Sequence, residues 1–148
     1  MIGNLLLSFL IMGCCISVQS FFAAVMLKAF FMFDDRGLIN SSVFRNAMIL
    51  STVTLIMLVG IVLQMLIWAT TFVAVGEFND LRHAFYHSAV NFTSLGYGDV
   101  VMSEERRLLG ALEAANGVLM FGLTTSLLFA LMAILIKRRW SAELSRHL

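Results

Sequence analysis

The chain has 148 residues and a net charge of +1; 60% of its residues are hydrophobic and only 13% are charged. That charged share is about half that of a soluble domain, so the composition indicates an integral membrane protein of at most one domain. The small net charge, with no basic stripe outside the membrane flanks, argues against nucleic acid as a partner. Cys14 and Cys15 are adjacent and predict neither a disulfide framework nor a zinc site.

Three apolar runs, each longer than the roughly 20 residues that a helix needs to cross a bilayer core, predict three transmembrane helices. The only charges inside them are Lys28 in the first run and Glu113 in the third. The expected segments are an N-terminal helix (1–33), a loop (34–46), a second helix (47–75), a last helix (104–137) and a short tail (138–148).

The distribution of lysine and arginine predicts the orientation, because loops rich in these residues stay in the cytoplasm. The first loop with its flank and the tail carry seven of them: Lys28, Arg36, Arg45, Lys137, Arg138, Arg139 and Arg146. The segment between the second and last helices carries three: Arg82, Arg106 and Arg107. We therefore expect the N-terminus outside, and the first loop and the C-terminus in the cytoplasm.

The segment between the second and last helices contains one short helix, expected over residues 79–92. Asn79 or Asp80 can cap its start, and "LRHAFYHSAVNF" is too short to cross a bilayer. Ser103, followed by two glutamates, is a suitable start for the last helix. The fold class is therefore an all-α membrane protein with three transmembrane helices and a re-entrant helix and loop before the last of them. Such a loop is tolerated at membrane depth only when it is buried in protein or lines a watery cavity.

The stretch "TSLGYGD" that follows the short helix has the properties of an ion pathway. An ion that crosses an oily core must exchange its water shell for fixed oxygens, which stacked backbone carbonyls can supply. Carbonyls that point the same way require alternating backbone conformations, some with positive φ, which glycine adopts at little steric cost. Gly96 and Gly98 suit that demand, and Ser94 can add a hydroxyl oxygen. The C-terminal end of the short helix favours a cation.

These residues resemble the selectivity filter of the tetrameric potassium channel pore-domain family. The order of span, pore helix, filter and span also matches, and "NGVLMFGLTTSLLFA" resembles the inner helix of that family. The resemblance covers roughly residues 47–137. The filter residues that match are Thr93, Ser94, Leu95, Gly96, Tyr97, Gly98 and Asp99.

The resemblance implies a subunit that conducts K⁺ passively in a homotetramer, without a cofactor and without enzymatic activity. K⁺ would be held by carbonyls of Ser94, Leu95, Gly96 and Tyr97, with the Ser94 hydroxyl at the innermost site and Asp99 at the outer mouth. A small bacterial-type channel of this kind implies the plasma membrane as its location, the lipid bilayer as a partner and no soluble ligand domain. On the inner helix, it implies a hinge at Gly117 with the Phe121–Gly122 pair a turn below, and a cavity lined by Phe121, Thr124, Thr125 and Leu128.

Departures from the family pattern leave alternatives open. Serine at 94 and leucine at 95 replace the usual threonine and valine, which keeps a non-selective cation channel as an alternative. A subunit that does not conduct is a further alternative. Gly-x-Gly-Asp also occurs in intramembrane aspartyl proteases, but their chemistry needs a second carboxylate on another span.

Several polar residues inside the spans call for partners. Glu113 is a candidate filter brace that acts through Asn91 or Tyr97; the alternative is a carboxylate that reaches the outer interface. Gln64 and Trp68 of the second helix are expected to hydrogen-bond between helices, and Gln19 is the expected polar contact of the first helix.

Overall fold

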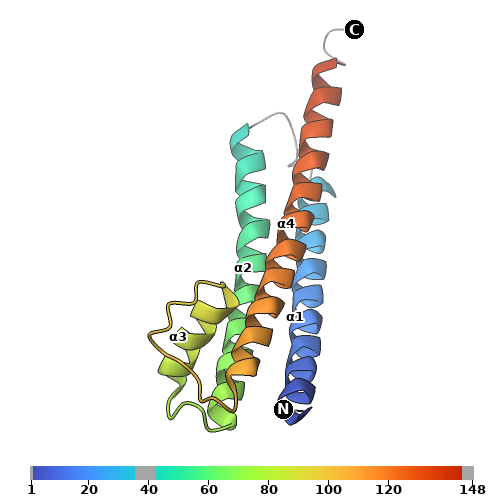
Figure 1. Cartoon of the computed structure of the whole chain (residues 1–148). Coiled ribbons are helices and arrows are strands. Elements are labelled where there is room, and N and C mark those ends of the chain that lie inside the picture. The colour runs from blue at the N-terminus through green and yellow to red at the C-terminus, as the bar shows by residue number, and fades with distance from the viewer. Residues whose placement is uncertain (1, 36–42, 145–148) are drawn as a thin grey trace. The chain divides into compact units, whose positions relative to one another are not determined.

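The computed structural model describes residues 2–35 and 43–144, and this part of the chain is helical, with no strand. The four helices are α1 (Ile2–Asp35), α2 (Val43–Ala74), α3 (Leu81–Phe92) and α4 (Arg107–Leu144), as Figure 1 shows. Mean hydropathies of 2.1, 2.4 and 2.3 make α1, α2 and α4 long and apolar enough to cross a membrane. The prediction of an all-α membrane protein is therefore confirmed.

The observed helix ends differ from the expected ones by a few residues. The first loop is shorter than 34–46, because α1 continues to Asp35 and α2 already begins at Val43. The last helix extends through most of the expected tail, since residues 138–144 contain no glycine or proline that would end it. Arg36 and Arg146, which entered the orientation argument, lie outside the described residues.

The last helix begins at Arg107 and not at residue 104, for a reason that lies elsewhere in the chain. The backbone N–H and the hydroxyl of Ser103 both donate to the carboxylate of Glu77, at 2.9 and 2.7 Å. The Ser103 side chain is thus held toward Glu77 and accepts no hydrogen bond from the N–H groups of the next turn, and residues 104–106 form a turn.

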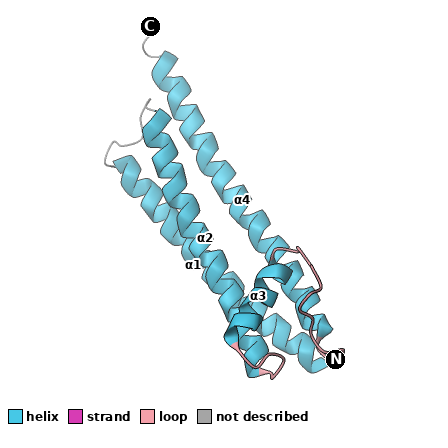
Figure 2. Cartoon of the chain, turned by 90° about the vertical axis from the view of Figure 1, so that its left-hand side faces the viewer, coloured by secondary structure: helices cyan, strands magenta, loops and turns pink. Residues whose placement is uncertain are grey.

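The chain divides into two compact units, of which the first comprises residues 1–19 and 60–122. Within this unit, the buried residues of α2 recur every three or four positions and form one face. A similar stripe on α4 faces the same core, and the short helix α3 lies beside the ends of α2 and α4 (Figures 1 and 2). The stripe on α2 consists of Ile61, Gln64, Met65, Trp68, Ala69 and Phe72; that on α4 of Leu109, Glu113, Asn116 and Met120.

The first half of α1 belongs to this unit through polar as well as apolar contacts. Gln64 donates from Nε2 to Oε1 of Gln19 at 2.6 Å, and both side chains are fully buried. The expected interhelical contact of Gln64 is therefore confirmed, with the expected residue of the first helix as its partner. Cys15 lies against Trp68 and Asn116.

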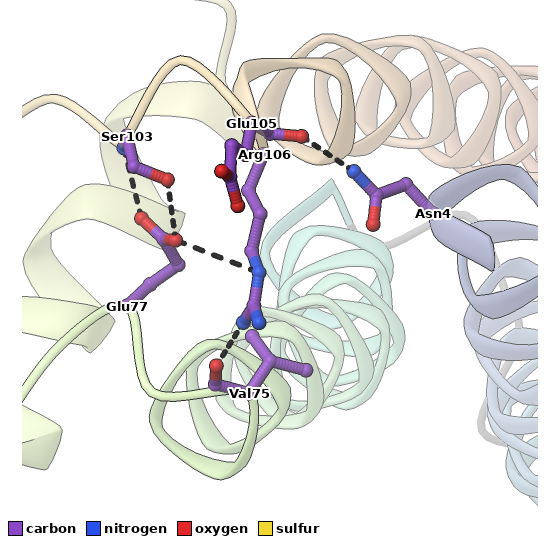
Figure 3. A network of polar contacts seen from close by, with 6 residues as sticks. All are labelled: Asn4, Val75, Glu77, Ser103, Glu105 and Arg106. Atoms are coloured by element: carbon purple, nitrogen blue, oxygen red, sulfur yellow. Dashed lines mark hydrogen bonds and ion pairs between the residues drawn. The ribbon is translucent and has the colours of Figure 1, made fainter. Parts of the chain in front are cut away.

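A polar network joins the segments on either side of α3 in the first unit (Figure 3). The Arg106 guanidinium donates to the Val75 carbonyl and pairs with the Glu77 carboxylate at 3.6 Å. The Asn4 side chain of α1 donates to the Glu105 carbonyl at 2.7 Å. The segments before and after α3 are thus fastened to one another and to the start of α1.

The second unit comprises residues 20–59 and 123–148 and has an apolar core of its own. Asp34, near the end of α1, accepts two hydrogen bonds from the Arg138 guanidinium, and the Nη2–Oδ2 distance is 2.6 Å. This bidentate pair joins α1 to α4 within the unit. The core consists of Met26, Phe30, Ile49, Val53, Met57, Leu131 and Leu135.

Candidate functional site

The candidate site begins with α3, whose start is fixed by an N-cap. Asp80 has an extended backbone, and its side chain accepts from the His83 backbone N–H at 2.8 Å and contacts the His83 ring at 2.6 Å. These hydrogen bonds lower the pKa of Asp80 below its usual value. Of the two expected caps, Asp80 is the one used.

The segment Thr93–Asp99, which we call the GYGD loop, is held against the last turn of α3 by its backbone N–H groups. The N–H groups of Leu95 and Gly96 both donate to the Val90 carbonyl, at 2.9 and 3.3 Å. Ser94 donates its backbone N–H to the Asn91 carbonyl at 2.8 Å. The N–H groups at the base of the loop therefore donate to α3, whereas the carbonyl groups of the loop do not take part in these hydrogen bonds.

The backbone of the GYGD loop alternates in conformation. Ser94, Gly96 and Gly98 have positive φ values of 58°, 60° and 73°, whereas the residues between them do not. This alternation is the one required for carbonyls that point in a common direction. Ser94 is the only non-glycine residue with positive φ in the described part of the chain, so the arrangement carries backbone strain at that position.

The carbonyl oxygens of residues 94–97 accept no hydrogen bond from any described residue. The side chains of the loop are also uncovered in the single chain: Leu95 is 55% exposed and Tyr97 is 66% exposed. A row of unpaired acceptors and two large exposed side chains make this segment incomplete as it stands.

The outer end of the GYGD loop is fastened to α3 by two adjacent side chains. The Tyr86 hydroxyl donates to Oδ2 of Asp99 at 2.6 Å, which lowers the pKa of Asp99 and raises that of Tyr86. His87 lies 2.8 Å from the Val100 carbonyl through Nδ1 and 2.8 Å from the Asn91 amide nitrogen through Nε2. The carbonyl can only accept, so Nδ1 carries the proton and Nε2 accepts from Asn91. Burial lowers the pKa of His87, although the Val100 carbonyl acts in the opposite direction.

Glu113, the candidate brace, is fully buried in the single chain and lies against α3. Its Oε1 lies 2.5 Å from the Ser88 hydroxyl, so its contact with α3 is one turn before Asn91. The amide of Asn91 is bonded to His87 and lies near the same carboxyl group. Ser88 belongs to no sequence motif, and no sequence pattern indicated that it would contact Glu113.

Gly117 lies against the end of α3, because a Cβ atom there would be 1.9 Å from the Phe92 carbonyl oxygen. Gly122 has open space around it, and the ring of Phe121 packs on that of Phe92 with 5.9 Å between centroids. Of the other residues expected to line a cavity, Thr124 is buried, Thr125 is exposed and Leu128 is half-buried.

A hollow of about 340 Å³ lies between the GYGD loop and α4 in the first unit. Its lining includes Val90, Asn91, Gly96, Gly98, Met102 and Ala111. No group of three or more residues suited to a transition metal occurs in the described ranges. The lining includes two glycines of the GYGD loop, and backbone oxygen is a ligand type that suits a hard cation such as an alkali ion.

Three helices long and apolar enough to span a membrane, a short helix that is not, and a loop with free carbonyls form the arrangement expected of an ion-conducting membrane protein. The sequence model of a family described as "Ion channel" matches residues 60–133, which is half of the chain. The chain belongs to this ion channel family. No curated protein and no solved structure matches it.

Proposed function

We propose that the chain is a subunit of a potassium-selective channel in which four copies of the GYGD loop surround one axis. The observation that carries this proposal is the row of carbonyls at residues 94–97, which accept no hydrogen bond while the N–H groups of Leu95 and Gly96 are tied to α3. In a tetramer these oxygens would replace the hydration shell of K⁺, and Asp99 would lie at the outer mouth. The N-terminus would be outside and the C-terminus in the cytoplasm of a bacterial plasma membrane.

The need for more than one copy follows from the exposure of the loop. One chain supplies one strand of carbonyls, which cannot enclose an ion. Leu95 and Tyr97 also remain exposed, and a neighbouring copy would cover them. Membership in the ion channel family supports this channel over the protease alternative.

The proposal is tested by reconstituting the purified protein in liposomes and comparing flux driven by K⁺ with flux driven by Na⁺. We expect a cross-linked tetramer and K⁺ flux that exceeds Na⁺ flux at least about tenfold, a difference in free energy of about 1.4 kcal/mol. Equal fluxes would replace the selective channel by the non-selective one, for which Leu95 is the reason. A verified tetramer that passes neither ion would overturn the proposal.

Replacement of Gly96 by alanine tests the loop itself. Gly96 has a φ of 60°, and an L side chain there costs about 1–2 kcal/mol, which the loop can recover only by turning a carbonyl away. We expect Gly96→Ala to abolish K⁺ flux with the tetramer intact. Gly76→Ala is the matched control, because Gly76 has a φ of 78° but lies outside the loop, and its flux should remain near wild type.

A further inference from the structure

Glu113 is a carboxyl group in the first unit with no opposite charge beside it. It is 0% exposed and takes part in none of the ion pairs formed by the described residues. Its polar neighbours are Ser88 and Asn91 of α3, and Cys15 of α1 is the titratable group that lies near it. From α2, the nearby polar atom is the Met65 carbonyl oxygen, which Ser88 reaches.

The protons available at Ser88 decide the charge of Glu113. The Ser88 Oγ lies 2.8 Å from the Met65 carbonyl oxygen and 2.5 Å from Oε1 of Glu113. A serine hydroxyl has one proton, and a carbonyl oxygen can only accept. If Ser88 donates to Met65, the short contact with Glu113 requires a second proton, which only the carboxyl group can supply.

The other carboxyl oxygen points to the same conclusion. Oε2 of Glu113 is buried and has no hydrogen bond of ordinary geometry to any residue that the structure describes, although the Asn91 amide lies near the carboxyl group. An ionised carboxylate in this position would leave half of its charge unsolvated, which costs far more than an unpaired neutral oxygen. A neutral acid that donates from Oε1 avoids this cost.

We propose that Glu113 is protonated in the folded protein and donates to Ser88, which in turn donates to Met65, and that this relay positions α3 beneath the GYGD loop. The role in positioning rests on the proposed channel function, whereas the protonation state does not. The relay joins α4, α3 and α2 through one chain of hydrogen bonds. Glu113 is thus a positioning residue and does not contact the ion path.

The relay reaches the GYGD loop through a short stretch of α3. Ser88 is two residues before Val90, whose carbonyl holds the N–H groups of Leu95 and Gly96. A shift of α3 along its axis, or a rotation about it, therefore moves Leu95 and Gly96, which lie at the centre of the carbonyl row.

Infrared spectroscopy of the protein in liposomes at neutral pH tests the protonation state directly. The difference spectrum between wild type and Glu113→Gln should contain the carbonyl band of a protonated carboxylic acid, shifted by a strong hydrogen bond, and Ser88→Ala should shift that band. A carboxylate band in its place would overturn the proposal. This measurement needs no ion flux, so it remains informative even if the protein conducts no ion.

Flux measurements test the positioning role. The amide introduced by Glu113→Gln can still donate to Ser88, so this variant should retain K⁺ flux within about threefold of wild type and keep its selectivity. Glu113→Leu and Ser88→Ala leave a buried group unpaired and should lower the K⁺/Na⁺ flux ratio about tenfold or more. Glu105→Leu, at an exposed glutamate just before α4, is the matched control and should behave as wild type. If Glu113→Gln loses selectivity in an intact tetramer as Glu113→Leu does, the relay is not what positions α3.

Discussion

At the scale of single residues, Gly117 has a steric role that the sequence does not reveal. The family resemblance implies that Gly117 is a hinge, where glycine would let the helix bend. The structure shows a different demand on this position, because α4 approaches the Phe92 carbonyl closely there. A hydrogen atom fits where a methyl group does not. The position therefore requires glycine whether or not the helix bends there.

Replacement of Gly117 by alanine should lower the free energy of unfolding by about 1–3 kcal/mol, because α3 or α4 must shift to make room. Gly122→Ala is the matched control. No atom lies within 4 Å of its added Cβ, so helix propensity alone should raise stability by about 0.5–1 kcal/mol. Denaturant titrations of the two variants in detergent check this, and equal stabilities would contradict the steric role.

At the scale of elements, α3 and the GYGD loop form one connected piece. The base of the loop is bonded to Val90 and Asn91, and its outer end is bonded to Tyr86 and His87. The loop therefore cannot shift along its length without breaking contacts at one end or the other.

His87 makes this connection sensitive to acid. Because burial lowers its pKa, the folded protein resists protonation, and the contribution of His87 is fully present above the ordinary histidine value of about 6.5. As the pH falls below that value, the unfolded chain takes up the proton first, so stability declines until the pH passes below the folded pKa. Asp99 and Glu77, whose pKa values are lowered, lose their contributions only below about pH 4.

We therefore expect the melting temperature to fall as the pH is lowered from about 7.5 to about 5, the range in which the unfolded histidine takes up its proton. His87→Gln should remove most of that fall, since glutamine does not titrate and can still donate to the Val100 carbonyl. A slope that His87→Gln leaves unchanged would show that another group is responsible.

The elements themselves follow from local sequence, but the contacts between them do not. Apolar runs predict the spans, Asp80 predicts the start of α3, and the spacing of Gly96 and Gly98 predicts the alternating loop. The partner of Glu113 depends on how far α3 and α4 are rotated about their axes, which no local pattern encodes. The start of α4 at Arg107 likewise depends on Glu77, which precedes α3 in the sequence, whereas α4 follows it.

At the scale of the whole molecule, the first half of α1 is part of the unit that carries the GYGD loop. Residues 1–19 pack with residues 60–122, and Gln19 and Gln64 share a buried hydrogen bond. The sequence of α1 contains no motif that indicates its role. The buried hydrogen bond between Gln19 and Gln64 nevertheless shows that the first half of α1 is attached to the first unit by polar as well as apolar contacts.

A double-mutant cycle measures this attachment. Gln19→Leu and Gln64→Leu should each destabilise the protein, and the double variant should lose less than the sum of the two. The coupling energy should be about 0.5–2 kcal/mol, the range found for hydrogen bonds between membrane helices. Denaturation in detergent provides the four free energies, and strictly additive losses would show that the 2.6 Å contact contributes nothing to stability.

The unpaired carbonyls of residues 94–97 also have a thermodynamic consequence. On the proposed function, the ion that occupies them binds the assembled state and has no comparable site in separated or unfolded chains. By mass action, assembly and ion occupancy are then linked, and stability rises with the logarithm of the concentration of the conducted ion. The concentration of the conducted ion in the solutions on either side of the membrane would therefore help to set the stability of the assembled channel.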